Sequence, residues 1–177
     1  MKYNPKKKFM KIAIDEAIKA NKKYGEFPIG AVVVKEDKLI SKSGNFAFRN
    51  KDTCSHAELI AIKRACQKLK TKYLHDCILY STNEPCVMCT GSAIWAEMKG
   101  IVFGANIKDM EEFWIKKKGI KKKNWKMIYI SCKEVLKKSQ PKGIFLIENF
   151  MGKECKKLFD EKLYSKSRNK RIKIFGK

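Results

Sequence analysis

Two short motifs, thirty residues apart, constrain this chain more than any other feature of its sequence. The first is His56-Ala57-Glu58, and the second is Pro85-Cys86-Val87-Met88-Cys89. Imidazole and thiolate groups are the ligands that Zn²⁺ prefers, and three protein ligands leave a fourth position for water. A fold that uses both motifs must bring these two segments together at one metal ion.

The local spacing supports a shared metal. Cys86 and Cys89 are three residues apart, so on a helix they project from the same face. Pro85 suits the first turn of a helix, where exposed amides favour thiolates over thiols. The pattern therefore predicts Zn²⁺ as a cofactor bound by His56, Cys86 and Cys89. An open zinc site is typical of catalysis, and Glu58 is then the predicted proton carrier.

Taken alone, each motif is compatible with a different role. A His-x-Glu sequence is often a solvated helix start, and a Cys-x-x-Cys pair can be redox-active or half of a structural zinc site. Cys54 precedes His56 by two residues and is an alternative fourth ligand. It would close the site and remove the water that Glu58 needs. The two motifs together favour the catalytic site.

Length and cysteine content define the class of protein. A chain of 177 residues can bury the core of one domain. We expect a zinc-dependent domain over 1–164 and a basic C-terminal tail over 165–177. The seven cysteines are odd in number and two of them form the Cys-x-x-Cys pair, which favours free thiols in a reducing cytoplasm. The sequence has no secretory signal and no apolar run of membrane-spanning length, so we expect no membrane partner.

The net charge of +23 raises the question of nucleic-acid binding. Only four of the 41 basic residues are arginine, although arginine is the preferred reader of phosphate and bases. The lysines are scattered over every segment. The charge therefore predicts nonspecific attraction to polyanions at low salt, with specific nucleic-acid binding as an alternative.

Hydrophobic periodicity predicts alternating helices and strands. The predicted helices are 6–24, 56–69, 86–96, 134–138 and 152–164, and the predicted strands are 29–34, 39–41, 77–81, 101–105, 127–130 and 144–147. Residues 45–55 are predicted to form a polar loop. The strand–helix–strand unit around the cysteines has a short crossover, which implies parallel neighbours in one sheet. We therefore expect an α/β fold, a three-layer α/β/α sandwich around a mixed sheet.

With these motifs, the chain resembles the cytidine and deoxycytidylate deaminase superfamily, whose zinc signature is H-x-E followed by P-C-x-x-C. The resemblance extends from Phe27 to Ala105. It implies a cytidine deaminase-like fold, hydrolytic removal of a nucleobase ring amine as ammonia, and a homodimer. It also implies that Asn45 hydrogen-bonds the base, that Phe27 and Pro28 form an apolar wall, and that Trp95 borders a purine.

Two branches of the superfamily resemble this chain and imply different substrates. The tRNA-specific adenosine deaminases share the Pro-Ile-Gly-Ala, Glu-Pro-Cys-Val-Met-Cys and Val-Phe-Gly-Ala stretches, whereas guanine deaminases resemble 61–66 and 76–80 and share Trp95. The tRNA branch has a Ser-Arg-Ile-like triplet and a Gly/Ala/Ser-rich loop where this chain has 96–99 and 107–110. Segment 106–143, where substrate choice would be decided, fits neither branch.

We therefore expect a free base or nucleoside as substrate, with guanine before others. Adenosine-to-inosine deamination of tRNA is the alternative within the enzyme class. A non-catalytic, zinc-stabilised RNA-binding module is the alternative from another class.

Overall fold

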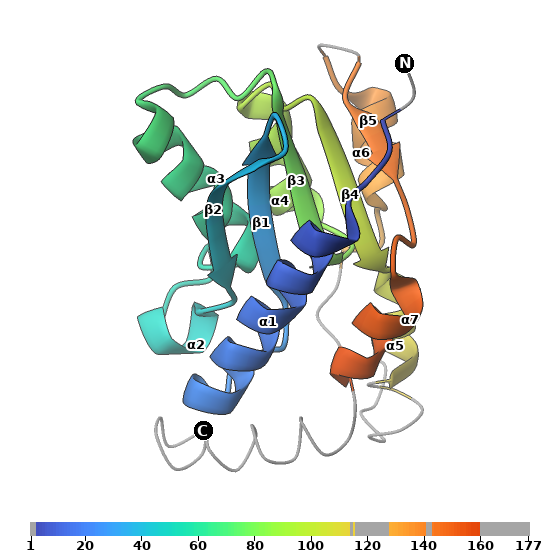
Figure 1. Ribbon diagram of the computed structural model, residues 1–177. Coiled ribbons are helices and arrows are strands. Elements are labelled where there is room, and N and C mark those ends of the chain that lie inside the picture. Colours follow the sequence, from blue (N-terminus) through green and yellow to red (C-terminus); the bar gives the residue numbers. More distant parts are fainter. Residues whose placement is uncertain (1–2, 114, 116–127, 141–142, 160–177) are drawn as a thin grey trace.

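The computed structural model describes residues 3–113, 115, 128–140 and 143–159, and its centre is a mixed five-stranded sheet (Figure 1). The strands are β1 (Gly30–Lys35), β2 (Lys38–Gly44), β3 (Cys77–Asn83), β4 (Gly100–Ala105) and β5 (Phe145–Ile147). Their order in the sheet is β2-β1-β3-β4-β5. β1 is antiparallel to β2 and β3, whereas β3, β4 and β5 are parallel to one another.

Helices cover both faces of this sheet, which confirms the predicted three-layer sandwich. The helices are α1 (Lys7–Tyr24), α2 (Ala47–Asn50), α3 (Ala57–Leu69), α4 (Val87–Trp95), α5 (Ile107–Glu112), α6 (Cys132–Lys138), α7 (Gly152–Lys156) and the 3₁₀ turn η3 (Lys157–Phe159). Alternate side chains of β3 face opposite layers. Leu79 packs in the cluster formed with α3 and α4, and Tyr80 packs in the cluster formed with α1.

Two opposed glycines allow α1 to lie directly against the hairpin formed by β1 and β2. Gly30 and Gly44 are paired across β1 and β2. A Cβ atom on Gly30 would lie 2.0 Å from the carbonyl oxygen of Ala13, and one on Gly44 would lie 2.7 Å from that of Glu16. Both positions therefore require glycine for the close approach of a helix backbone to the sheet.

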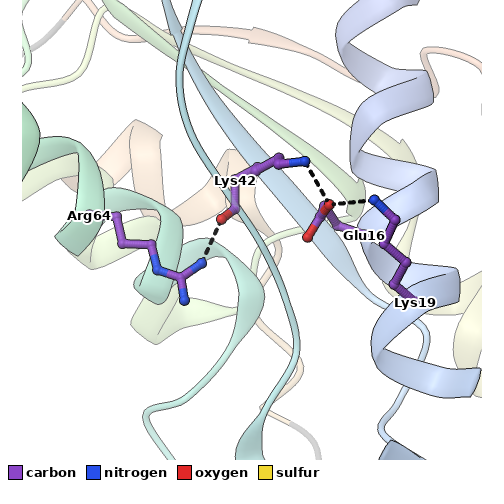
Figure 2. A network of polar contacts seen from close by, with 4 residues as sticks. All are labelled: Glu16, Lys19, Lys42 and Arg64. Carbon is purple, nitrogen blue, oxygen red and sulfur yellow. Dashed lines mark hydrogen bonds and ion pairs between the residues drawn. The ribbon is translucent and has the colours of Figure 1, made fainter. Parts of the chain in front are cut away.

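The edge strand β2 is held by side chains from both helix layers (Figure 2). On one side, the ammonium group of Lys42 lies 3.0 Å from the carboxylate of Glu16 on α1. On the other side, Arg64 of α3 donates to the carbonyl of Lys42 at 2.8 Å, and Lys68 donates to the carbonyl of Ile40 at 3.1 Å. These bonds occupy carbonyls that an uncovered edge would offer to another strand.

Two of the predicted elements differ from the structure. The predicted strand 127–130 is wrong over the part that is described, because residues 128–130 form no strand and their side chains are exposed. β4 pairs with β5 instead, so within the described ranges this apolar run has no neighbouring strand to bind. Within the described residues, the predicted helix 152–164 consists of the short α-helix α7 followed by the 3₁₀ turn η3, which reaches Phe159. Residues 160–164 and the predicted tail 165–177 lie outside the described residues.

The helix α2 occurs where a polar loop was expected. Its amides at Phe48 and Arg49 donate to the carboxylate of Glu26, at 3.3 and 2.7 Å. A distant side chain thus performs the capping that is usually supplied by the residue at the helix start. In the part of the chain that the structure describes, no helix has both the length and the apolar character needed to cross a membrane.

Candidate active site

The three predicted metal ligands meet at the adjoining starts of α3 and α4. His56 is the N-cap residue of α3, Cys86 is the N-cap residue of α4, and Cys89 lies in the first turn of α4. The Nδ1 atom of His56 lies 3.7 Å from the sulfur of Cys86 and 3.5 Å from that of Cys89, and the two sulfurs are 3.6 Å apart. A tetrahedral zinc ion with bonds of about 2.3 Å to sulfur and about 2.0 Å to nitrogen needs spacings of about 3.5–3.8 Å.

The donor set and its spacing therefore fit zinc. Among the described residues, the group that can hold a metal consists of His56, Cys86 and Cys89. Cys54, the alternative fourth ligand, is exposed and is not a member of this group. Three protein ligands are typical of catalytic zinc sites, which leave a fourth position for water, whereas structural zinc sites usually have four protein ligands.

The three ligand side chains change one another's pKa values before any metal binds. The Cys89 thiol hydrogen-bonds the Cys86 sulfur and lowers the pKa of Cys86 to about 4. The same bond, together with burial, raises the pKa of Cys89 well above its ordinary value. The hydrogen bond to Cys86 raises the pKa of His56. The thiolate is thus centred on Cys86, beside an imidazole that holds its proton more tightly than usual.

We expect zinc uptake at pH 7 to release between about one and two protons per chain, because zinc binds only thiolate and neutral imidazole. Cys89 supplies one proton, His56 supplies a fraction set by its raised pKa, and Cys86 is already deprotonated. Zinc affinity should therefore rise with pH. Calorimetric titration in buffers of different ionisation enthalpy measures the proton count. Uptake without proton release would contradict the assigned ligands.

Glu58 is the predicted proton carrier, and this role stays a prediction. It is 3 % exposed in the first turn of α3, and burial raises the pKa of its carboxyl group. The hydroxyl of Ser81 donates to its Oε1 at 3.0 Å, and the charges of His56 and Cys86 act on the same carboxyl group. The carboxyl group therefore lies close to the metal ligands. Ser81 was not predicted, although a serine in an otherwise apolar buried strand was a visible signal.

Glu84 is a second buried carboxylate that the sequence reasoning missed. It lies between β3 and Cys86, and its two oxygens accept from the amides of Ile107 at 3.0 Å and Cys132 at 2.9 Å. These amides lie at the starts of α5 and α6. Glu84 thereby attaches two parts of the segment 106–143 to the loop that carries the cysteine ligands.

Asn83, at the end of β3, has a buried carbonyl oxygen without a hydrogen-bond partner among the described residues. Its Nδ2 donates to the Glu84 carbonyl at 3.3 Å, and since a carbonyl can only accept, the amide cannot be turned to exchange its two ends. We expect Asn83→Leu to change the free energy of unfolding by less than about 1 kcal/mol, because it removes an unpaired acceptor together with the donor to the Glu84 carbonyl. Denaturant unfolding of the zinc-loaded protein measures this, and a larger loss of stability would show that the oxygen is bonded in solution.

The predicted substrate residues fall into two places. Asn45 follows β2, is buried, and donates from Nδ2 to Glu26 at 3.1 Å. Pro28 is buried, and the ring of Phe27 packs against Phe48 at 5.6 Å between centroids. The amide of Phe46, next to Asn45, donates to the carbonyl of Ser55, the residue before His56.

Trp95 lies apart from these residues. It ends α4, nine residues beyond Cys86, which is a rise of about 13 Å along a helix. Its side chain is 84 % exposed. The substrate role of Trp95 stays a prediction, as do those of Asn45, Phe27 and Pro28.

Comparison with known proteins identifies relatives of this arrangement. Residues 3–105 match the model of the cytidine and deoxycytidylate deaminase zinc-binding region. A tRNA-specific adenosine deaminase of Aquifex aeolicus is 46% identical over 100 residues, which cover 56% of this chain and 66% of that protein. Guanine deaminase of Bacillus subtilis is 41% identical over 85 residues, which cover 48% of this chain and 54% of that protein.

A solved structure extends the similarity beyond the matched region. It comes from a study of A-to-I editing by tRNA:A34 deaminases, and it superposes with a TM-score of 0.70 at 27% identity over 86% of this chain and 99% of that one. The zinc-binding region, the ligand geometry and the fold agree with one another. The chain belongs to the cytidine and deoxycytidylate deaminase family of zinc-binding proteins.

Proposed function

We propose that this protein is a zinc-dependent hydrolase that deaminates a nucleobase ring amine on a free base or nucleoside, with guanine as the first candidate. The observation that carries the proposal is the buried carboxyl group of Glu58, which accepts a hydrogen bond from Ser81 and lies close to the metal ligands His56 and Cys86. When bound by His56, Cys86 and Cys89, zinc supplies activation of water near neutral pH.

Glu58 would perform the proton transfers of the hydrolysis. It accepts a proton from the attacking water, delivers one to a ring nitrogen, and helps to protonate the leaving amine. The water oxygen forms a bond to the amine-bearing carbon, the carbon–nitrogen bond breaks, and the nitrogen departs as ammonia. The Ser81 hydroxyl holds Oε1 by a hydrogen bond, so Oε2 is the oxygen better placed to carry the proton.

Asn45, Phe27 and Pro28 would bind the base in this proposal. A small substrate is favoured by the two departures from the tRNA-editing pattern, at 96–99 and 107–110. In the second of these, residues 107–112 form the helix α5, which Asn106 and Asp109 close with reciprocal side-chain bonds to each other's amides.

Deamination of a wobble adenosine in tRNA is the second candidate. Two observations favour it: the 46% identity to a tRNA-specific adenosine deaminase and the net charge of +23. Such a substrate requires a base turned out of a loop into the pocket, and its binding would weaken steeply with salt. A homodimer is part of either proposal, because the family resemblance implies one.

The two candidates and the non-catalytic alternative separate in one assay of ammonia release by zinc-loaded protein. The panel contains guanine, adenine, cytosine, their nucleosides, and a tRNA anticodon stem-loop with a wobble adenosine. Turnover of a free base or nucleoside supports the first candidate, and turnover of the stem-loop alone supports the second. RNA binding that is unchanged in Glu58→Ala, without any turnover, would replace both by a zinc-stabilised RNA-binding module.

A further inference from the structure

Glu26 is a fully buried carboxylate outside the metal group, with no exposed surface. It follows α1, and its backbone carbonyl accepts from the side chain of Asn21 in the last turn of that helix, at 2.8 Å. Its carboxylate accepts from Asn45 at 3.1 Å and from the amides of Phe48 and Arg49 at the start of α2. One side chain therefore joins the end of α1, the end of β2 and the helix α2.

A buried carboxylate loses the hydration that stabilises its charge, so it needs several N–H donors in place of water. Two of these donors to Glu26 are backbone amides at a helix start, which suit a negative charge. A third is the side chain of Asn45. This third bond adds nothing to the capping of α2, and its effect is on Asn45 itself.

The bond determines which end of the Asn45 amide is the donor. A side-chain amide can be turned so that its nitrogen and oxygen exchange places, and the hydrogen-bond network decides between the two arrangements. A carboxylate only accepts, so the nitrogen of Asn45 must face Glu26. The carbonyl oxygen and the second N–H of the amide then have fixed directions.

The same carboxylate positions an aromatic pair. The amide of Phe48 donates to Glu26 at 3.3 Å, and the ring of Phe48 packs against Phe27, the residue that follows Glu26. The rings are tilted by 48° at 5.6 Å. Both the amide and the apolar wall that the proposed function assigns to the base are therefore attached to one side chain.

We propose that Glu26 is a positioning residue for base recognition, which fixes the Asn45 amide and the Phe27–Phe48 pair. This inference rests on the proposed function, because it presumes that Asn45 and Phe27 contact the base. The competing role is purely structural, in which Glu26 only caps α2.

A double-mutant cycle between Glu26→Leu and Asn45→Ala separates these roles. Leucine removes both acceptor oxygens, whereas glutamine would keep one that can still accept from Asn45. If Glu26 acts through Asn45, Glu26→Leu raises KM for the substrate by about tenfold, the equivalent of one hydrogen bond, with full zinc content and little change in kcat. The rise is then smaller in the Asn45→Ala background, where only the effect through the Phe27–Phe48 pair is left. Equal rises in both backgrounds would overturn the inference. Glu16→Leu is the matched control, since Glu16 bonds Lys42 and Lys19 instead.

A spectroscopic measurement keeps this test independent of turnover. The side-chain ¹⁵N–¹H₂ signals of Asn45 should shift in Glu26→Leu and stay in place in Glu16→Leu. Unchanged signals in Glu26→Leu would overturn the inference even if the wild type deaminates a base. Shifted signals in a protein that deaminates none of the tested substrates would support the Glu26–Asn45 contact. They would also contradict the proposed function, and therefore the role of Glu26 in base recognition.

A reciprocal pair covers the case in which Glu26→Leu does not fold. Asn45→Asp places two carboxylates face to face and should lower Tm. Adding Glu26→Gln restores one donor and one acceptor, with the direction of the bond reversed. Recovery of Tm in the double variant supports the contact, and a further fall in Tm would contradict it.

Discussion

Glu58→Ala is expected to eliminate ammonia release while the protein keeps its zinc and its fold. General acid–base catalysis by one side chain contributes roughly 10²–10⁴-fold, and Glu58 would serve three proton transfers, so the loss should lie at or beyond the upper end. Zinc should remain because Glu58 is not among the three ligand atoms. Ammonia release, zinc content and Tm are measured on the same preparation.

Two comparisons make this result interpretable. Glu97→Ala is the control, because Glu97 is a half-exposed carboxylate paired with His75 on the surface, at 3.4 Å. Glu58→Gln keeps the shape of the side chain and removes its ability to carry a proton. Normal turnover in either Glu58 variant would refute the mechanism. Cys86→Ala does not discriminate, because both the catalytic and the structural role of zinc require that ligand.

The metal ligands were predictable because each of them lies in a short sequence motif at the start of a recognisable helix. Cys86 and Cys89 share one helical turn, and the proline and the strand before them predict where that turn begins. His56 stands at the start of another helix with its own amphipathic pattern. α3 follows β2 by way of α2, α4 follows β3, and both strands are antiparallel to β1, so the two helix starts fall at the same end of the sheet. The sequence therefore predicts the ligands together with the elements that carry them.

The carboxylates that hold the site together were not predictable in this way. Glu84 bonds the amide of Cys132, 48 residues later in the chain, and Glu26 bonds that of Arg49, 23 residues later. The carboxylate oxygens of both residues accept hydrogen bonds from backbone amides. Every residue except proline has such an amide, so the residue types in the sequence do not indicate which residue is the partner. The helix α2 was missed for the same reason, because its capping group is Glu26.

The predicted strand 127–130 failed for a related reason. A run such as Ile128-Tyr129-Ile130 satisfies the composition of a strand. A strand also needs a neighbouring strand with free N–H and C=O groups, and β4 pairs with β5 instead. Strand-like composition can be seen in the sequence, whereas the availability of a neighbouring strand depends on the tertiary fold.

Gly30→Ala is expected to produce the largest loss of stability, about 3 kcal/mol or more, which is about 10 °C in Tm for a domain of this size. The added methyl group would lie 2.0 Å from the Ala13 carbonyl oxygen and 2.7 Å from the Ala17 nitrogen, which are backbone atoms of α1. Neither can turn away as a side chain can, so the helix itself must move.

Gly91→Ala is the matched control, because Gly91 lies inside α4 with nothing within 4 Å of the added methyl group. Alanine there should add roughly 0.5–1 kcal/mol through helix propensity. Equal Tm values for the two variants would show that α1 does not press against the hairpin. A displaced α1 would also carry Asn21 and the Glu26 segment with it, because Asn21 bonds the Glu26 carbonyl. Gly30→Ala should therefore shift the Asn45 side-chain signals, whereas Gly91→Ala should leave them unchanged.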